Sequence, residues 1–297
     1  MQPKSQMDLF GAVSLTGFAL LLAFNQVVIK VTNDGLQPVF FAALRSLGGA
    51  VLIYLWMQVR GISLSIAPGT VLPGLAVGAV FAFEFICLFL ALDLTSVART
   101  SVIFYTMPVW LALGAHVLLP GDRLTVMKSA GLALAVAGVA VALLTRDGDD
   151  ASIAGDLLAL LAAMAWAAIA LLARGSALRE VRPEQQLLWQ LVVSTPLLLL
   201  AAPFFGELFR DPSLIHWAGL GFQIVAVVSA GFLFWFWLLS IYPASSVAAF
   251  SFLSPVFGVA LGWLLLGEQV GAELWIALAL VCGGLVLINR PVRSRSA

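Results

Sequence analysis

The residues best suited to chemistry are the few ionisable side chains inside the long apolar runs of this 297-residue chain. Arg45, Glu84 and His116 are the candidates, because an ionised group deep in a bilayer costs several kcal/mol unless it faces a bundle interior or water. Arg45 lies about seven residues from the expected outer end of its run and Glu84 about nine, so both are roughly 10 to 14 Å deep. Asn25 lies at nearly the same depth. These polar side chains are therefore expected to converge on one layer.

Two interpretations of this layer stay open. In the first, Arg45 and Glu84 form an ion pair that fixes the register of neighbouring helices, and Asn25 bridges two helices. In the second, Glu84 lines a solute cavity, where its carboxylate binds a substrate ammonium or takes up and releases a proton. A neutral residue at position 84 would destabilise the fold in the first case and impair solute handling in the second.

Other candidates for lining a cavity are aromatic, amide and hydroxyl side chains. The dense aromatic runs from Phe81 to Phe89 and from Phe232 to Trp237 point in all directions, so most of their rings are expected to face lipid. Aromatic residues beside small or polar neighbours are better candidates, and polar side chains in apolar surroundings need partners. The set chosen on these grounds is Tyr105, Trp166, Trp189, Gln190, Gln223 and Ser251. The alternative for each aromatic residue is packing against lipid or the core.

Several kinds of site are not expected in this chain. His116 has no second His, Cys or acidic residue at ligand spacing, so no metal site is predicted. The sequence has no Gly-x-x-x-x-Gly-Lys-[Ser/Thr] loop, and therefore ATP is not expected to drive it directly. The apolar runs hold no nucleophile–base pair and no acidic cluster, so neither an enzyme active site nor a cofactor is expected.

The composition is that of a membrane protein. Hydrophobic residues make up 62% of the chain and Asp, Glu, Lys and Arg only 10%, whereas soluble domains are roughly 45 to 50% apolar and about 25% charged. Fifteen basic and fifteen acidic residues cancel to a net charge of zero, so no overall field attracts nucleic acid. A water-soluble globular protein is excluded.

Ten apolar windows are long enough to cross a bilayer as helices. They are Leu9–Val31, Val39–Val59, Thr70–Leu92, Ser96–Leu119, Leu124–Leu144, Gly155–Ala173, Gln185–Phe205, Ile215–Ser240, Ala244–Leu266 and Gly271–Ile288. The alternating pattern of a membrane barrel is missing. The expected fold is an all-α integral membrane protein with ten transmembrane helices. The windows from Leu124 and from Gly271, the fifth and tenth, have almost no polar side chain and are expected at the periphery, as a scaffold or a dimer face.

The positions of Lys and Arg predict the orientation. With the N-terminus inside, the cytoplasmic ends carry Lys4, Arg60, Arg123, Lys128, Arg174, Arg179, Arg182, Arg290, Arg293 and Arg295, and the outer ends only Lys30, Arg99, Arg146 and Arg210. Both termini are predicted to be cytoplasmic.

The two halves of the sequence look related. The stretch Ser101–Asp122 matches Ala248–Glu268, and the matched positions are Pro108 with Pro255, Gly121-Asp122 with Gly267-Glu268, and Gly138 with Gly284. Five helices per copy is an odd number, so residues 1–148 and 149–297 are expected to form two inverted repeats. Such repeats are typical of secondary transporters, with the substrate between them. Shared Leu and Ala composition is the alternative origin of so weak a repeat.

Three short motifs resemble the first-repeat pattern of the EamA-type branch of the drug/metabolite transporter superfamily: Asn25–Lys30 (NQVVIK), Gln37-Pro38 and Leu44-Arg45. The stretch Ala91–Pro108 is similar to the family's third and fourth helices, and Leu238–Pro255 is its second-half counterpart. The resemblance covers almost the whole chain. It implies a bacterial inner-membrane transporter of amino acids or similar solutes, most like the branch that exports aromatic amino acids. The aromatic–glycine pair of the motif is Phe24-Asn25 here, whereas Trp166 stands at the matching place in the second half.

Together these observations predict a secondary transporter that exports amino acids, aromatic or other neutral ones, by alternating access. The expected partners are the small solute and membrane lipids, with protons as a candidate coupling ion, and the chain is expected to be a monomer or a homodimer. The alternative function is a membrane-embedded enzyme or a flippase-like lipid handler.

Overall fold

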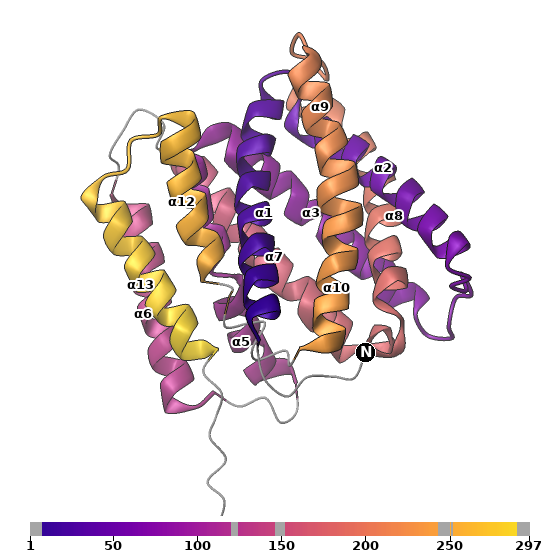
Figure 1. Ribbon diagram of the computed structural model, residues 1–297, viewed down its shortest axis with the longest axis horizontal. Coiled ribbons are helices and arrows are strands. Elements are labelled where there is room, and N and C mark those ends of the chain that lie inside the picture. Colours follow the sequence, from indigo (N-terminus) through magenta and orange to yellow (C-terminus); the bar gives the residue numbers. More distant parts are fainter. Residues whose placement is uncertain (1–7, 120–123, 146–151, 243–249, 251, 290–297) are drawn as a thin grey trace, which may run out of the picture.

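A computed structural model describes residues 8–119, 124–145, 152–242, 250 and 252–289 (Figure 1). The helices before residue 145 are α1 (Leu9–Asn33), α2 (Pro38–Val59), α3 (Val71–Leu94), α4 (Val97–Phe104), α5 (Met107–Leu118) and α6 (Val126–Leu144). After residue 152 come α7 (Ile153–Gly175), η1 (Ala177–Glu180), α8 (Pro183–Ala201), η2 (Ala202–Phe205), α9 (Leu214–Phe222), η3 (Gln223–Gly231), α10 (Phe232–Ile241), α12 (Leu253–Leu266) and α13 (Ala272–Ile288). Within the described residues there is no β-strand, only an isolated bridge between Leu36 and Phe209.

The described helices are those of an integral membrane protein. Eight stretches are long and apolar enough to cross a bilayer, counting α4 with α5, α8 with η2, and α9 through α10 as single stretches. The helices α12 and α13 are apolar but shorter. The all-α class is therefore confirmed, whereas ten spans in two inverted repeats stay a prediction. The start of the expected ninth span at Ala244 lies outside the described residues.

The expected span from Ser96 to Leu119 is interrupted in its middle. Helix α4 ends at Phe104 and α5 begins at Met107, with Pro108 in the first turn of α5. Proline has no N–H, and its ring clashes with the carbonyl four residues earlier, so a continuous helix through Pro108 is disfavoured. The Thr106 hydroxyl donates instead to the Ile103 carbonyl at 2.6 Å. The break sets Tyr105 at the end of a helix.

The expected span from Ile215 to Ser240 is continuous but changes its winding. The central segment η3 is a π-helix between α9 and α10. In it, the Ser229 hydroxyl donates to the carbonyl of Ile224, five residues earlier, at 2.8 Å. Segments of π-helix are rare and are often found at functional sites. Gln223 is the first residue of this segment.

The most extensive helix pairs join the two halves of the chain: α6 with α13, α3 with α7, α2 with α8, α3 with α8, and α1 with α12. In Figure 1, α6 and α13 form one edge of the bundle, α2 and α8 the other, and α1 runs between α12 and the α9–α10 stretch. The two halves are thus interleaved rather than separate bodies.

Glycines allow α6 and α13 to approach each other closely. A Cβ added to Gly284 would lie 2.5 Å from the Gly131 carbonyl oxygen, and one added to Gly138 would lie 2.8 Å from the Ala277 carbonyl oxygen. Small residues at helix crossings of this kind permit backbone contact. The matched positions Gly138 and Gly284 therefore both lie in this one interface.

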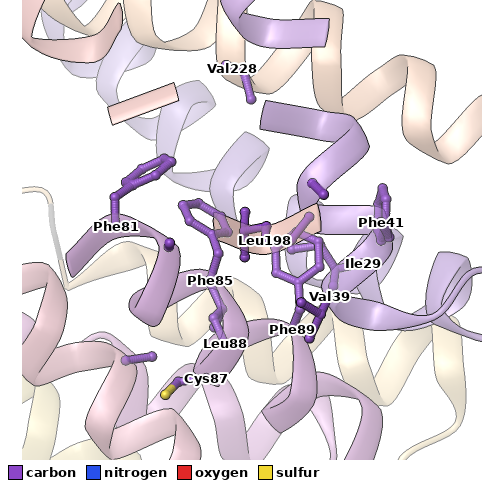
Figure 2. Packing of buried hydrophobic residues seen from close by; sticks show 14 of the residues in the cluster. Ile29, Val39, Phe41, Phe81, Phe85, Cys87, Leu88, Phe89, Leu198 and Val228 are labelled. Atoms are coloured by element: carbon purple, nitrogen blue, oxygen red, sulfur yellow. The ribbon is translucent and has the colours of Figure 1, made fainter. Parts of the chain in front are cut away.

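The expectation that most of the aromatic run in α3 faces lipid is wrong. Phe81, Phe85 and Phe89 are buried, and only Phe83 is exposed. Residues four apart share a face of a helix, so the three buried rings form a column, with centroids 4.4 and 5.4 Å apart. Figure 2 shows this column packed with Phe41 in the largest core cluster.

Candidate functional site

A cavity of about 160 Å³ lies between helices from both halves of the chain. Its wall includes residues of α1, α2, α3, α7, α10 and α12 and the α4–α5 break. The polar and aromatic residues on it are Asn25, Gln26, Arg45, Glu84, Tyr105, Trp166 and Ser254, with Phe18, Phe85, Phe104, Phe232, Trp235 and Phe250. The cavity extends from the level of Asn25 toward the N-terminal half of α1, where it meets Leu15.

Arg45 is held in place by hydrogen bonds that run through two amide side chains, those of Gln223 and Asn25. Its Nε donates to the Gln223 side-chain oxygen at 2.9 Å, and the Gln223 amide nitrogen donates to the Asn25 side-chain oxygen. The guanidinium lies over the Phe85 ring, 4.2 Å from its centroid. Residues from α1, α2 and η3 thus fix the position of one cation. The Arg45 Nη1 atom is buried and has no hydrogen-bond partner among the described residues.

Glu84 is 2% exposed and also lines the cavity. Its Oε2 atom has no hydrogen-bond partner in the described part of the chain. Among those residues, the ion pairs join Arg99 with Asp156, Arg179 with Glu180, and Arg210 with Asp93, and none joins Arg45 to Glu84. A direct salt bridge between Arg45 and Glu84 is therefore not what holds α2 to α3. The Arg45 Nη1 and Glu84 Oε2 atoms, which lack hydrogen-bond partners among the described residues, are therefore available to a ligand.

Gln26 is a cavity residue that the sequence reasoning missed. It is 1% exposed, and its side-chain oxygen accepts a hydrogen bond from the Ser101 hydroxyl at 2.6 Å. Its Nε2 atom has no partner within the described residues. The Tyr105 side chain lies near those of Gln26 and Ser254. An amide in the middle of an apolar run was the available signal, and Asn25 beside it was singled out instead.

The structure brings together most of the residues singled out from the sequence. Asn25, Arg45, Glu84, Tyr105 and Trp166 line the cavity, and Gln223 hydrogen-bonds to two of them. Phe232 and Trp235 line the cavity as well, so some rings of the second aromatic run also face the cavity.

The remaining residues of that set are elsewhere. Trp189 lines a separate hollow beside Tyr54 and Thr70 and packs against Gly74. Gln190 is half-buried on α8 and lines neither of these two spaces. Ser251 lies outside the described residues. His116 accepts a hydrogen bond from the Leu124 N–H at 3.3 Å, and the described residues hold no group of three His, Cys, Asp or Glu side chains that could bind a metal.

A second polar region lies where α1 and α3 end and α4 and α7 begin. We call it the paired end; its members are Lys30, Asp93, Arg99, Asp156, Arg210 and Glu268. Arg99 and Asp156 are both buried, and Arg99 Nη2 lies 2.5 Å from Asp156 Oδ2. Arg210 contacts Asp93 at 2.8 Å, and the Lys30 ammonium donates to the Thr95 carbonyl at 2.9 Å. The charges that the sequence placed at outer helix ends, Lys30, Arg99 and Arg210, are thus grouped at one end of the bundle.

Comparison with known proteins identifies the family. The model of the EamA-like transporter family matches residues 9–144 and 153–290. The uncharacterized transporter YoaV of Bacillus subtilis is 25% identical, with 94% of this chain and 95% of that protein covered. The probable amino-acid metabolite efflux pumps of Escherichia coli and Salmonella typhimurium are 29% and 30% identical, covering 92% and 91% of this chain and 92% and 93% of theirs.

A solved crystal structure shares the fold, with a TM-score of 0.66 at 21% identity over 95% of this chain and 98% of that one. The relatives are not specific to the branch that exports aromatic amino acids, so that finer resemblance stays a prediction. Their names indicate a transporter rather than an enzyme. With a family model that matches nearly the whole chain, this multi-pass membrane protein belongs to the EamA-like transporter family.

Proposed function

We propose that this transporter exports an amino acid or a related zwitterionic solute across the bacterial inner membrane by alternating access. The observation that carries the proposal is a set of buried polar atoms around one cavity that have no hydrogen-bond partner in the described part of the chain: Arg45 Nη1, Gln26 Nε2 and Glu84 Oε2. Two of these groups donate hydrogen bonds and the third is a carboxylate oxygen that accepts them. A free amino acid carries the complementary groups.

In the proposed binding mode, the solute carboxylate accepts hydrogen bonds from Arg45 and Gln26, and its ammonium donates to Glu84. Charge-assisted hydrogen bonds of this kind are roughly twice as strong as neutral ones. The apolar part of the solute contacts the aromatic rings of the cavity wall, such as Phe104 and Trp235. Two relatives named as amino-acid metabolite efflux pumps support the choice of cargo.

Transport by purified protein in proteoliposomes tests the cargo. The panel contains one labelled aromatic amino acid, the amine formed by removing its carboxylate, and the acid formed by removing its amino group, each with and without a pH gradient. We expect the intact amino acid to be transported at least tenfold faster than either derivative, which corresponds to about 1.4 kcal/mol. Equal rates for all three solutes would contradict the zwitterion proposal.

A matched pair of variants ties the result to the cavity. Glu84→Gln keeps the size of the side chain and removes the charge. It should therefore reduce the difference in transport rate between the amino acid and the acid that lacks the amino group. Glu184→Gln makes the same change at the start of α8, away from the cavity, and should behave as the wild type. Loss of discrimination in both variants would point to a general effect of charge.

The two-repeat architecture and the orientation belong to this proposal. Residues 1–148 and 149–297 form two inverted five-helix halves with both termini in the cytoplasm, which is supported by the separate family matches to 9–144 and 153–290 and by the positions of Lys and Arg. Cysteines introduced at Asp149 and Arg179 test the orientation. An impermeant reagent added to intact cells should label the first and not the second, and the reverse result would overturn it.

A further inference from the structure

Glu268 joins the two halves of the chain at the paired end. It follows Gly267, whose left-handed backbone (φ 68°) ends α12. Its two carboxylate oxygens accept hydrogen bonds from the N–H groups of Val97 at 2.6 Å and Ala98 at 2.8 Å, at the beginning of α4. The first N–H groups of a helix have no partners within the helix and carry its positive dipole end, so a carboxylate binds there favourably.

Close packing of α12 on α4 is built around this contact. A Cβ added to Gly262 would lie 2.3 Å from Glu268 Oε2 and 3.2 Å from the Ala98 nitrogen. One turn away, a Cβ on Gly258 would lie 2.0 Å from the Ser101 hydroxyl. An alanine at Gly262 would displace the Glu268 carboxylate from the α4 N–H groups, and one at Gly258 would clash with Ser101 of α4.

The same interface reaches the cavity. Ser101, which packs under Gly258, donates to the cavity residue Gln26. Helix α4 then ends at the break where Tyr105 lines the cavity. From Val97 to Tyr105 the rise along the helix is roughly 12 Å. The contact of Glu268 therefore lies on one side of the cavity along α4, and the cavity extends from there toward the N-terminal half of α1.

We propose that the Glu268 carboxylate is a latch that holds α12 against α4 and closes the paired end, and that it must release α4 before the cavity can open at this end. The proposal rests on the alternating access proposed above. Val97 and Ala98 offer main-chain donors, so the latch requires a carboxylate at position 268 and no particular side chain on α4. The neutral amide of Glu268→Gln keeps one acceptor and turns an N–H group toward the α4 donors.

Distances between spin labels across the interface test the latch without any solute. Labels at Leu94, the last residue of α3, and Leu265, in the last turn of α12, stand on exposed positions. In the wild type we expect one dominant short distance. In Glu268→Gln the population with a second, longer distance should rise at least threefold. The same rise is expected in Gly262→Ala, in which Glu268 itself is unchanged. A control pair at Val136 and Ile276, exposed on α6 and α13, should not change.

Glu273→Gln is the matched control, because it neutralises a carboxylate in the first turn of α13 instead. It should leave the distance between the labels at Leu94 and Leu265 as in the wild type. The latch is refuted if folded Glu268→Gln and Gly262→Ala both retain the wild-type distribution. Because no solute is needed, a longer distance together with no amino-acid transport would leave the latch standing and overturn the proposed cargo.

Discussion

The cavity and the paired end both bury ionisable side chains, but they differ in whether those side chains have partners. At the paired end, Asp156 accepts hydrogen bonds from Arg99 and from the Thr95 hydroxyl, and Arg99 also donates to the Ala142 carbonyl. In the cavity, Arg45 and Glu84 each keep one polar atom that no described residue hydrogen-bonds. The first arrangement uses buried charge to join helices, whereas the second holds buried charge ready for a ligand.

The two regions also differ in how the desolvation cost of their buried charges is offset. A paired buried charge recovers its desolvation cost within the protein, and removing one partner leaves the other uncompensated. A charged group with a free hydrogen-bonding atom recovers more of that cost when a solute binds. Substitutions at the paired end should therefore reduce stability, and substitutions in the cavity should reduce transport at nearly unchanged stability.

The largest expected effect is on stability, from Asp156→Asn at the paired end. The variant leaves the buried Arg99 guanidinium without its counter-charge, and losing one partner of a buried pair costs about 3 to 5 kcal/mol. Thermal unfolding of the purified protein measures the loss, with Arg99→Met/Asp156→Leu as the control in which both charges are removed. The double variant should recover much of the stability. A single variant as stable as the wild type would show that the pair does not join these helices.

The next effect is on transport, from Glu84→Gln in the cavity. Transport of the proposed amino acid should fall at least tenfold, about 1.4 kcal/mol, whereas the unfolding temperature should stay nearly unchanged because Glu84 forms no ion pair with another described residue. Both quantities are measured on the same purified protein. A large loss of stability would restore the interpretation in which Glu84 is a structural partner, and normal stability with normal transport would eliminate both roles.

Gln26→Met should have a smaller effect on transport. Methionine has a similar length but no N–H donor, so the solute carboxylate loses one of its proposed hydrogen bonds. Because Arg45 still faces the solute carboxylate, we expect the Michaelis constant to rise several-fold with little change in maximal rate. Gln190→Met, the same change outside the cavity, should have no effect. Equal effects at the two positions would contradict the assignment of Gln26 to the site.

The sequence predicted the existence of the helices and the grouping of three polar side chains, because both depend on local properties. Apolar runs of sufficient length form helices in a bilayer, and depth follows from counting residues to the helix end. Asn25, Arg45 and Glu84 were grouped on this basis, and the structure brings them to one cavity.

Rotation about the helix axis and long-range pairing could not be predicted in the same way. The helices are apolar on nearly all faces, so no polar stripe distinguishes the side of Trp189 from that of Trp166. The partner of Arg99, Asp156, is 57 positions away in the sequence, and nothing local indicates it. Nor does the sequence show the π-helical segment that sets Gln223 beside Arg45.

The smallest expected effect comes from Asp93→Asn, which tests whether pairing or burial decides stability at the paired end. Arg210 and Asp93 are 2.8 Å apart like a buried pair, but their side chains are 36% and 20% exposed. Arg210 also keeps its hydrogen bond to the Asn33 carbonyl in the variant. Water screens such a pair, and exposed pairs contribute about 0 to 1 kcal/mol. We therefore expect a shift in unfolding temperature several times smaller than for Asp156→Asn, and one that shrinks further at high salt. Losses of equal size for the two variants would mean that charge pairing alone, independent of burial, holds this end together.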